Sequence, residues 1–346
     1  MVDDPGQGSM PAVSRGGAGR LARIVLLGTG GTIASSAADA AQLHDYQVTV
    51  GVDAILAAVP QVRQLADVRC EQLMNVESHE IDNAMLLGMA RRIQALLDED
   101  DVDGVVITHG TDTLEESAYF LNLVLDTAKP VVVVGAMRPA TALSADGPLN
   151  LLNAVRLAAC AEAGGKGVLV MLNDRIGAAR HVTKMHTTAT DAFYSAEQGS
   201  LGEIAGGVVH FFSAPTRRHT THCEFSLADI DALPQVDIIF DHLGAGAHLY
   251  RAAIEAGACG IVLAATGNGS LSPSARQGAA LARERGVVFV RSSRVGQGVV
   301  TDSADDAVLD TVAANSLNPQ KARILLMLVL CVTRDVAAIR DCFRLY

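Results

Sequence analysis

The sequence has few aromatic residues and no long apolar run. Tryptophan is absent from its 346 residues, and aromatic residues make up only 4%. The longest uninterrupted apolar stretch is residues 324–332, whereas a membrane-spanning helix needs about 20 residues. Hydrophobic residues nevertheless amount to 49%, which excludes a disordered chain. We therefore expect a soluble protein with no membrane partner and a core built mainly of valine, leucine, isoleucine and alanine.

Basic residues are outnumbered by acidic ones. The chain has 27 lysines and arginines against 38 aspartates and glutamates, which gives a formal net charge of −11. Proteins that bind nucleic acid neutralise phosphates with basic side chains, and anionic membranes attract basic segments in the same way. The charge balance therefore argues against a nucleic-acid partner and against an anionic membrane surface.

Cysteine pairs and an export signal are also missing. The six cysteines form no CxxC motif and have no regular spacing, so we expect small buried apolar residues and neither a disulfide framework nor a zinc site. Residues 1–22 are rich in glycine and serine and lack the apolar segment of a signal peptide. We expect a flexible leader there and a cytoplasmic protein; a periplasmic location is the alternative, if an export signal has been removed.

Short apolar runs alternate with longer amphipathic segments in the first two thirds of the chain. The runs that end in a glycine or a polar turn are residues 23–27, 104–107, 131–134 and 167–171. The helical patterns between them are residues 83–97, 114–125 and 149–161. Continuously apolar runs of this length are typical of strands buried on both faces of a parallel sheet. The alternation predicts an α/β fold with a doubly wound, mostly parallel sheet.

This pattern breaks in a polar stretch and then resumes. Residues 213–233 contain Pro215 and paired arginines without a helix or strand period, which predicts a linker. Strands are expected after it at residues 236–240, 260–264 and 286–290, and helices at residues 247–256, 273–285, 319–332 and 335–343. We therefore expect a larger N-terminal domain over residues 23–212 and a smaller α/β C-terminal domain over residues 234–346.

Two polar segments follow apolar runs directly, at the position where open α/β sheets bind their ligands. The first, GTGGTI at residues 28–33, has Ile33 where a dinucleotide-binding loop needs glycine, and no lysine follows to make a phosphate loop. A glycine-rich turn without any ligand is one explanation of this segment. Against it stands Thr32, whose hydroxyl is placed at the ligand-binding edge.

The second segment, THGTDT at residues 108–113, brings hydroxyls, a carboxylate and an imidazole together. Thr113, with Glu116 three residues later, fits a capping box at a helix start. Capping does not account for Thr111 and Asp112, which precede that helix. A nucleophilic threonine needs a base or a cation to activate it, and Lys184 is a candidate; a solvated surface lysine is an equally weighted alternative.

Other catalytic and metal-binding patterns are missing. The chain has neither a GxSxG nor an HExxH motif. His219 and His222 are three residues apart, but they fall in the expected linker and have no carboxylate partner nearby. We therefore expect no metal site.

Several segments together resemble the bacterial-type L-asparaginases, and within them the type II branch that includes glutaminase-asparaginases. They are GTGGTIAS (28–35), HGTDTLEESAYFL (109–121), VGAMRP (134–139), SADGPLNLLNAV (144–155), VTK (182–184), GNGS (267–270), RSSR (291–294) and SLNPQKARILLMLVL (316–330). The resemblance covers residues 23–346. It implies an amidohydrolase that converts L-asparagine to L-aspartate and ammonia without a cofactor, with L-glutamine as a second candidate substrate.

The resemblance also implies roles for individual residues. Thr32 matches the nucleophile, and Tyr46 matches a tyrosine on a mobile lid that assists it. Thr111 and Asp112 match a threonine–aspartate pair, and Lys184 matches the lysine bonded to them. Backbone N–H groups of the glycine-rich turn and of Thr111 are then expected to hold the oxyanion of the reaction.

Substrate binding and assembly follow from the same resemblance. Ser78 matches the serine that holds the substrate α-carboxylate, and Asp112 matches the aspartate that receives the α-amino group. The family pattern implies a homotetramer whose sites are shared between subunits. Ser270 and Asp305, or Asp306 in place of the latter, are the residues expected to complete a neighbour's site.

Two positions depart from the family pattern. His79 stands where the family usually has glutamine or glutamate after the binding serine, and Asp305 stands where many members have glutamate. A protonated imidazole would repel the substrate ammonium group, and imidazole has an unperturbed pKa of about 6.5. Our hypothesis is that His79 lowers the affinity for substrate below about that pH.

Two other functions remain open at this stage. A related tRNA-dependent amidotransferase subunit shares the fold, but it carries an extra N-terminal domain for which about 22 residues leave no room, and the charge is wrong for tRNA. A non-catalytic sensor of amino acids or nucleotides is the alternative from another class. The set of Thr32, Tyr46, Thr111, Asp112 and Lys184 argues against it, because binding alone does not require a nucleophile.

Overall fold

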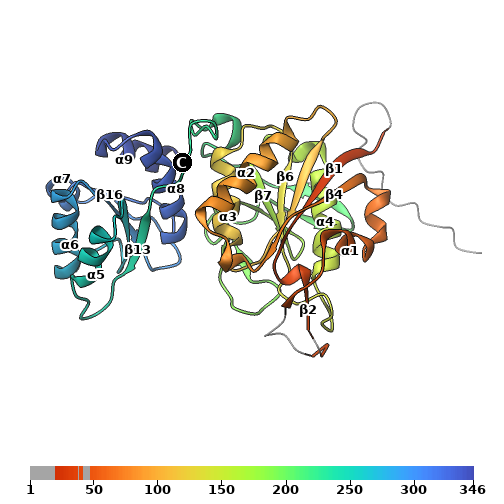
Figure 1. Cartoon of the computed structure of the whole chain (residues 1–346), viewed down its shortest axis with the longest axis horizontal. Helices are drawn as coiled ribbons and strands as arrows, with labels where there is room; N and C mark the ends of the chain where they lie inside the picture. The colour runs from red at the N-terminus through yellow and green to blue at the C-terminus, as the bar shows by residue number, and fades with distance from the viewer. Residues whose placement is uncertain (1–19, 38, 42–46) are drawn as a thin grey trace, which may run out of the picture.

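The structure is a computed structural model that describes residues 20–37, 39–41 and 47–346. Tyr46 lies outside the described residues, so its role remains a prediction. Figure 1 shows a large N-terminal body and a smaller C-terminal body, each with a sheet covered by helices. This arrangement confirms the predicted α/β class.

The N-terminal sheet has the strand order β12-β11-β8-β7-β6-β5-β1-β4. Its strands are β1 (Ala22–Gly30), β4 (Ala66–Val76), β5 (Gly104–Thr108), β6 (Val131–Val134), β7 (Val168–Leu172), β8 (Arg175–Ala178), β11 (Gly202–Ala205) and β12 (Val208–Phe211). The pairs from β4 to β7 are parallel, and those from β7 to β12 are antiparallel. The apolar runs predicted four of these parallel strands, which are β1, β5, β6 and β7.

Helices cover both faces of this sheet. Along β1, Val25 and Leu27 pack into a core with α2 (Asn83–Leu97) and α3 (Leu114–Val124). Ile24 and Leu26 face the other side and pack with α1 (Val52–Ala57) and α4 (Gly147–Ala158). Because both faces of the strand are buried there, the four consecutive residues 24–27 are all apolar.

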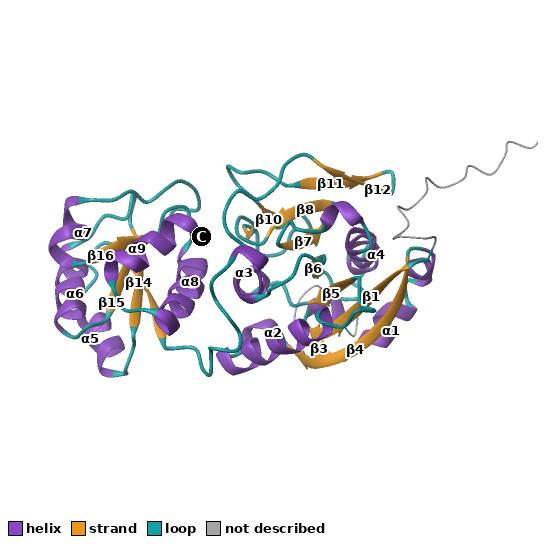
Figure 2. Ribbon diagram, turned by 90° about the horizontal axis from the view of Figure 1, so that it is seen from above, coloured by secondary structure: helices purple, strands orange, loops and turns teal. Residues whose placement is uncertain are grey.

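The C-terminal body repeats this arrangement on a smaller scale. Its parallel strands are β13 (Val236–Phe240), β14 (Gly260–Ala265), β15 (Val288–Ser293) and β16 (Thr311–Ala313), in that order. Its helices are α5 (His248–Glu255), α6 (Pro273–Glu284), α7 (Ala304–Leu309), α8 (Pro319–Val332) and α9 (Val336–Leu345). Helix α8 lies between this sheet and α3, as Figure 2 shows, and one apolar core continues across it.

Individual residues at the boundaries explain where several helices and strands begin. Asp82 accepts from the Met85 amide at the start of α2, and Asn318 accepts from the Lys321 amide at the start of α8. The predicted strands at residues 167–171 and 286–290 begin later, because Gly167 and Gly286 adopt left-handed turns with φ of 71° and 66°.

The cysteines, the linker and the strand β4 differ from what the sequence pattern predicted. The six cysteines are free, but they are half-exposed and not buried. The expected linker contains a short 3-10 turn at Thr220–His222. The sequence pattern missed β4, because this edge strand alternates polar and apolar residues. In the described part of the chain, no helix is long and apolar enough to cross a membrane.

Candidate active site

The two glycine-rich motifs meet at the point where the strand order of the sheet reverses. The chain runs from β1 to β4 on one side and then through α2 to β5 on the other side of β1. Ligands of open α/β sheets bind at such a point, beyond the carboxyl ends of the strands. Thr32 follows β1 and Thr111 follows β5, so both lie at this crevice.

The glycines of the first motif allow the two loops to touch. Gly30 and Gly31 adopt left-handed backbone conformations, with φ of 100° and 78°. A Cβ atom on Gly31 would lie 2.2 Å from the Gly110 Cα. The loop that carries Thr32 therefore packs directly on the backbone next to Thr111.

One backbone donor proposed for the oxyanion is already in use. The amide of Gly31 donates to the carbonyl of Val76 at 3.0 Å, which corrects the expectation that the glycine-rich turn as a whole supplies N–H groups. At the ends of the two strands, the Thr29 hydroxyl donates to the Thr108 carbonyl at 2.7 Å. These bonds hold β4, β1 and β5 in a fixed arrangement beneath Thr32.

We expect Gly31→Ala to destabilise the protein by more than about 4 kcal/mol, because strain and overlap with Gly110 add together. Gly199→Ala is the matched control, since Gly199 has a similar φ of 70° but open space around it. That change should cost only about 1 kcal/mol. Urea unfolding of both variants measures the difference, and equal losses would show that the loop contact is unimportant.

Thr111, Asp112 and Lys184 form a hydrogen-bonded cluster. Lys184 lies on β9 (Thr183–Lys184), which pairs with β10 (Phe193–Tyr194). Its Nζ donates to Thr111 Oγ1 at 2.9 Å and to Asp112 Oδ1 at 2.7 Å. The Lys184 side chain is 17% exposed and that of Asp112 is 64% exposed. Lys184 is thus a partner of the motif residues and not a solvated surface lysine.

Ser78 follows β4 and lies beside Gly110 and Thr113, the neighbours of this cluster in the sequence. It begins the 3-10 turn Ser78–Glu80, and a Cβ on Gly110 would come within 2.7 Å of its Oγ. Thr113 donates its hydroxyl proton to the Ser78 carbonyl at 2.8 Å. Thr113 is the N-cap of α3 but makes no capping bond with its side chain, so the predicted capping box is wrong: the hydroxyl holds Ser78 instead.

His79 and His109 differ in their surroundings. The His79 side chain is 60% exposed, and its Nδ1 lies 3.4 Å from a carboxylate oxygen of Glu77. His109 is fully buried, and its Nδ1 lies 2.7 Å from the Gly110 carbonyl, to which it donates. Burial lowers the pKa of His109, so this imidazole is neutral and stabilises the loop without carrying charge.

The residues expected to serve a neighbouring subunit lie in the C-terminal domain. Ser270 is exposed in the turn after β14. Asp305 is engaged by Arg276, with both carboxylate oxygens bonded to the guanidinium. In the described residues, neither Ser270 nor Asp305 is hydrogen-bonded to the Lys184 cluster of the same chain.

Asp306 does not fit the role of a neighbour-supplied acid. It is buried and accepts from Arg291 and from the Thr311 hydroxyl. Burial alone would raise the pKa of Asp306, but these bonds hold it below its ordinary value. Its carboxylate is therefore a structural counter-ion inside its own domain.

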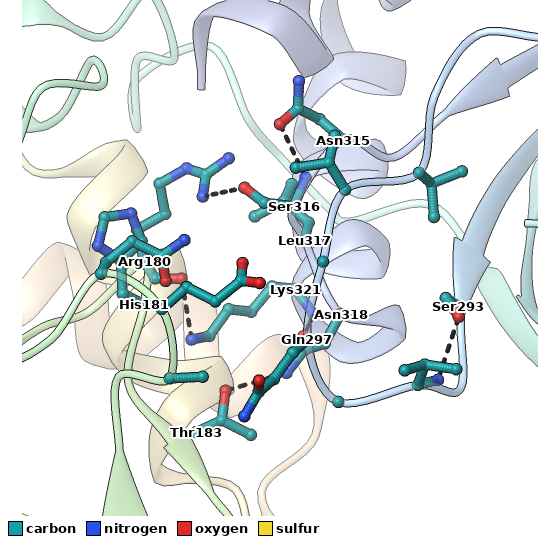
Figure 3. Close-up of a pocket in the computed structure, with 18 of the residues that line it drawn as sticks. Arg180, His181, Thr183, Ser293, Gln297, Asn315, Ser316, Leu317, Asn318 and Lys321 are labelled. Atoms are coloured by element: carbon teal, nitrogen blue, oxygen red, sulfur yellow. Dashed lines mark hydrogen bonds between the residues drawn. The ribbon is translucent and has the colours of Figure 1, made fainter. Parts of the chain in front are cut away.

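A cavity of about 270 Å³ is lined by residues of both domains (Figure 3). Thr183 and Met185, the neighbours of Lys184, line it together with Arg180 and Lys321. Our sequence reasoning did not identify the last two residues. The available signal for Lys321 was a lysine shortly before the apolar segment 324–332.

The comparisons with known proteins agree with this geometry. Residues 23–217 match the family profile "Asparaginase, N-terminal", and residues 235–343 match "Glutaminase/Asparaginase C-terminal domain". L-asparaginase 2 of Bacillus subtilis is 53% identical over 94% of this chain and 87% of that protein. Glutaminase-asparaginase of Pseudomonas fluorescens is 47% identical over 94% and 90%.

A solved structure is similar over nearly the whole chain. The probable cytoplasmic L-asparaginase of Campylobacter jejuni superposes with a TM-score of 0.92 at 44% identity, covering 94% of this chain and all of that one. The two profiles, the identity to these relatives and the shared architecture lead to one conclusion: the chain belongs to the asparaginase family.

Proposed function

We propose that this protein hydrolyses L-asparagine to L-aspartate and ammonia, with Thr32 as the nucleophile. The observation that carries the proposal is the Lys184 ammonium, which joins Thr111 and Asp112 next to the loop of Thr32. Membership of the asparaginase family supports the reaction class. L-glutamine, one carbon longer, is the second candidate substrate, because one relative is a glutaminase-asparaginase.

The proposed reaction has two steps. Thr32 Oγ attacks the carbon of the side-chain amide, the C–N bond breaks, and ammonia leaves with the proton that the hydroxyl loses. Water then attacks the resulting ester and releases aspartate and free Thr32. Lys184 keeps a positive charge beside the hydroxyl cluster, which stabilises negative charge that develops there.

Two further side chains suit the α-substituents of the substrate. Asp112 is exposed and negatively charged, and we assign it to the α-ammonium group. The Ser78 hydroxyl is buried beside Gly110, and we assign it to the α-carboxylate. The backbone amide of Thr111 remains our candidate for the oxyanion.

Ammonia release from L-asparagine and from L-glutamine tests this function. Release from neither amide would overturn it. Thermal stabilisation by ATP or NAD, but not by aspartate, would favour the sensor, since a ligand of the native state raises its stability.

We expect kcat/KM for L-asparagine to fall on acidification. The reason is that a positively charged His79 imidazole repels the substrate ammonium group. The nearby Glu77 would pair with part of this charge and limit the fall to a few-fold. The matched variant His79→Gln should show no such fall while keeping kcat at neutral pH. Identical acid limbs of the two pH profiles would contradict the role of His79.

For assembly and location we retain the expectations drawn from the sequence. We propose a homotetramer in which Ser270 and Asp305 reach a neighbour's site; Asp305 would have to leave Arg276 to do so. A mass of one subunit in light scattering would contradict it. We propose a cytoplasmic protein, as the name of the Campylobacter relative states for that enzyme; recovery in the periplasmic fraction would favour export.

A further inference from the structure

Lys321 is a buried cation at the boundary between the two domains. It lies in the first turn of α8 and is 1% exposed. Burial lowers its pKa to about 8, although Glu115 acts in the opposite direction. Removing an ammonium group from water is unfavourable unless several oxygens surround it. The Lys321 ammonium therefore depends on the oxygen atoms that contact it.

One set of contacts reaches the segment that carries Lys184. The Nζ of Lys321 donates to the carbonyls of Arg180, at 3.0 Å, and Val182. Asn318, the N-cap of the same helix, donates to Thr183 Oγ1 at 3.3 Å. Figure 3 shows Lys321 and Asn318 pointing from α8 toward this segment. The start of α8 thus holds the residues that immediately precede Lys184.

A second contact reaches the segment that carries Thr111. Glu115 lies in the first turn of α3, four residues after Thr111, and its Oε2 is 4.0 Å from the Lys321 Nζ. This carboxylate is 5% exposed, and its other oxygen accepts from Gln320 at 3.2 Å. One ammonium group therefore connects both segments whose side chains meet in the Thr111–Lys184 bond.

We infer that Lys321 is a positioning residue that sets the distance between Lys184 and Thr111. Its kinetic consequence rests on the proposed function, but its geometric consequence does not. The C-terminal domain then contributes to the site of its own chain through α8. An apolar side chain at this position could fill the space, but it has no donor for the two carbonyls.

The test compares four forms of the full-length protein with the wild type. Lys321→Met removes the ammonium and leaves the buried Glu115 carboxylate without its positively charged partner. Lys321→Met/Glu115→Gln also removes the unpaired buried charge, so it guards against loss of folding. Lys321→Arg keeps donors and charge. Gln320→Ala is the matched control, because it breaks a bond to Glu115 without touching the carbonyl of Val182.

The double variant should recover part of the melting temperature that Lys321→Met loses, because the unpaired charge is gone while two carbonyls still lack their donor. Its kcat should stay at least tenfold below the wild type, with KM within threefold. Lys321→Arg should recover part of the activity, and Gln320→Ala should stay within twofold of the wild type. Recovery of kcat together with stability in the double variant would overturn the inference, because Lys321 would then act only as a counter-ion.

A crystal structure of the double variant gives a readout that does not depend on activity. We expect the distance from Lys184 Nζ to Thr111 Oγ1 to exceed about 3.5 Å, beyond a hydrogen bond. A distance unchanged from 2.9 Å would overturn the inference. If the wild type releases no ammonia from L-asparagine, the proposed function fails, while this distance still decides the role of Lys321.

Discussion

Thr32→Ala is expected to abolish ammonia release, with a loss in kcat of at least about 10⁴-fold. The reason is that a side chain that forms the covalent bond has no substitute, whereas binding groups lose only part of the rate. Thr32 lies in a single 3-10 turn, Thr32–Ala34, and is buried. The change removes only two non-hydrogen atoms there, Oγ1 and Cγ2, so the fold should be retained. Ammonia assays at saturating L-asparagine measure the effect.

Two variants make this result specific. Thr32→Ser keeps the hydroxyl and should retain measurable activity. Thr29→Val removes a buried hydroxyl from the end of β1, three residues before Thr32, where Thr29 donates to the Thr108 carbonyl. It should lower stability by about 1–2 kcal/mol but change kcat by less than about tenfold. A Thr29 variant as inactive as Thr32→Ala would mean that the loop needs structural integrity and not a nucleophile. Wild-type rates in Thr32→Ala would exclude the proposed mechanism.

Lys184→Met and Thr111→Val should each lower kcat/KM by about 10³-fold. The two side chains share a bond of 2.9 Å, so we expect them to act as one unit. The double variant should then lose little more than either single variant, because groups that act together are not additive. A thermodynamic cycle from the four kinetic constants gives the coupling directly.

A second lysine provides the control for this cycle. Lys129 is partly buried and donates to the carbonyls of Leu97 and Glu99, near the end of α2. Lys129→Met should lower stability without changing kcat/KM by more than about twofold. If the losses from Lys184→Met and Thr111→Val multiplied in the double variant, the two residues would act independently, and the proposed cluster would not be the working unit.

The parts of the fold that could be predicted were those with a simple burial pattern. Val131–Val134 and Asn83–Leu97 match the predicted ranges, because one segment is buried on both faces and the other has a regular apolar stripe. The strand β4 is missed by a search for continuously apolar runs, because Ala66, Val68 and Cys70 alternate with polar residues. This alternation is itself the pattern of a half-buried edge strand.

The candidate site was predictable to the extent that it lies next to strand ends. Thr32 and Thr111 follow apolar runs, so the adjacency of their loops could be inferred from sheet topology. The contact of Lys184 with Thr111 could not be inferred from sheet topology, because 73 residues separate them; the family resemblance was what indicated it. The roles of Lys321 and Glu115 could not be inferred from the sequence pattern for the same reason. The partners of each side chain lie on other elements of the structure.

The apolar core that crosses α8 has a consequence for unfolding. Side chains of α3, α8 and both sheets belong to one continuous cluster, so neither body can lose its packing without exposing the helix that the other body buries. The two bodies should therefore unfold together, with one free energy of unfolding for both. Heating should therefore produce a single cooperative transition in which the Thr111–Lys184 cluster and the C-terminal sheet are lost at the same temperature.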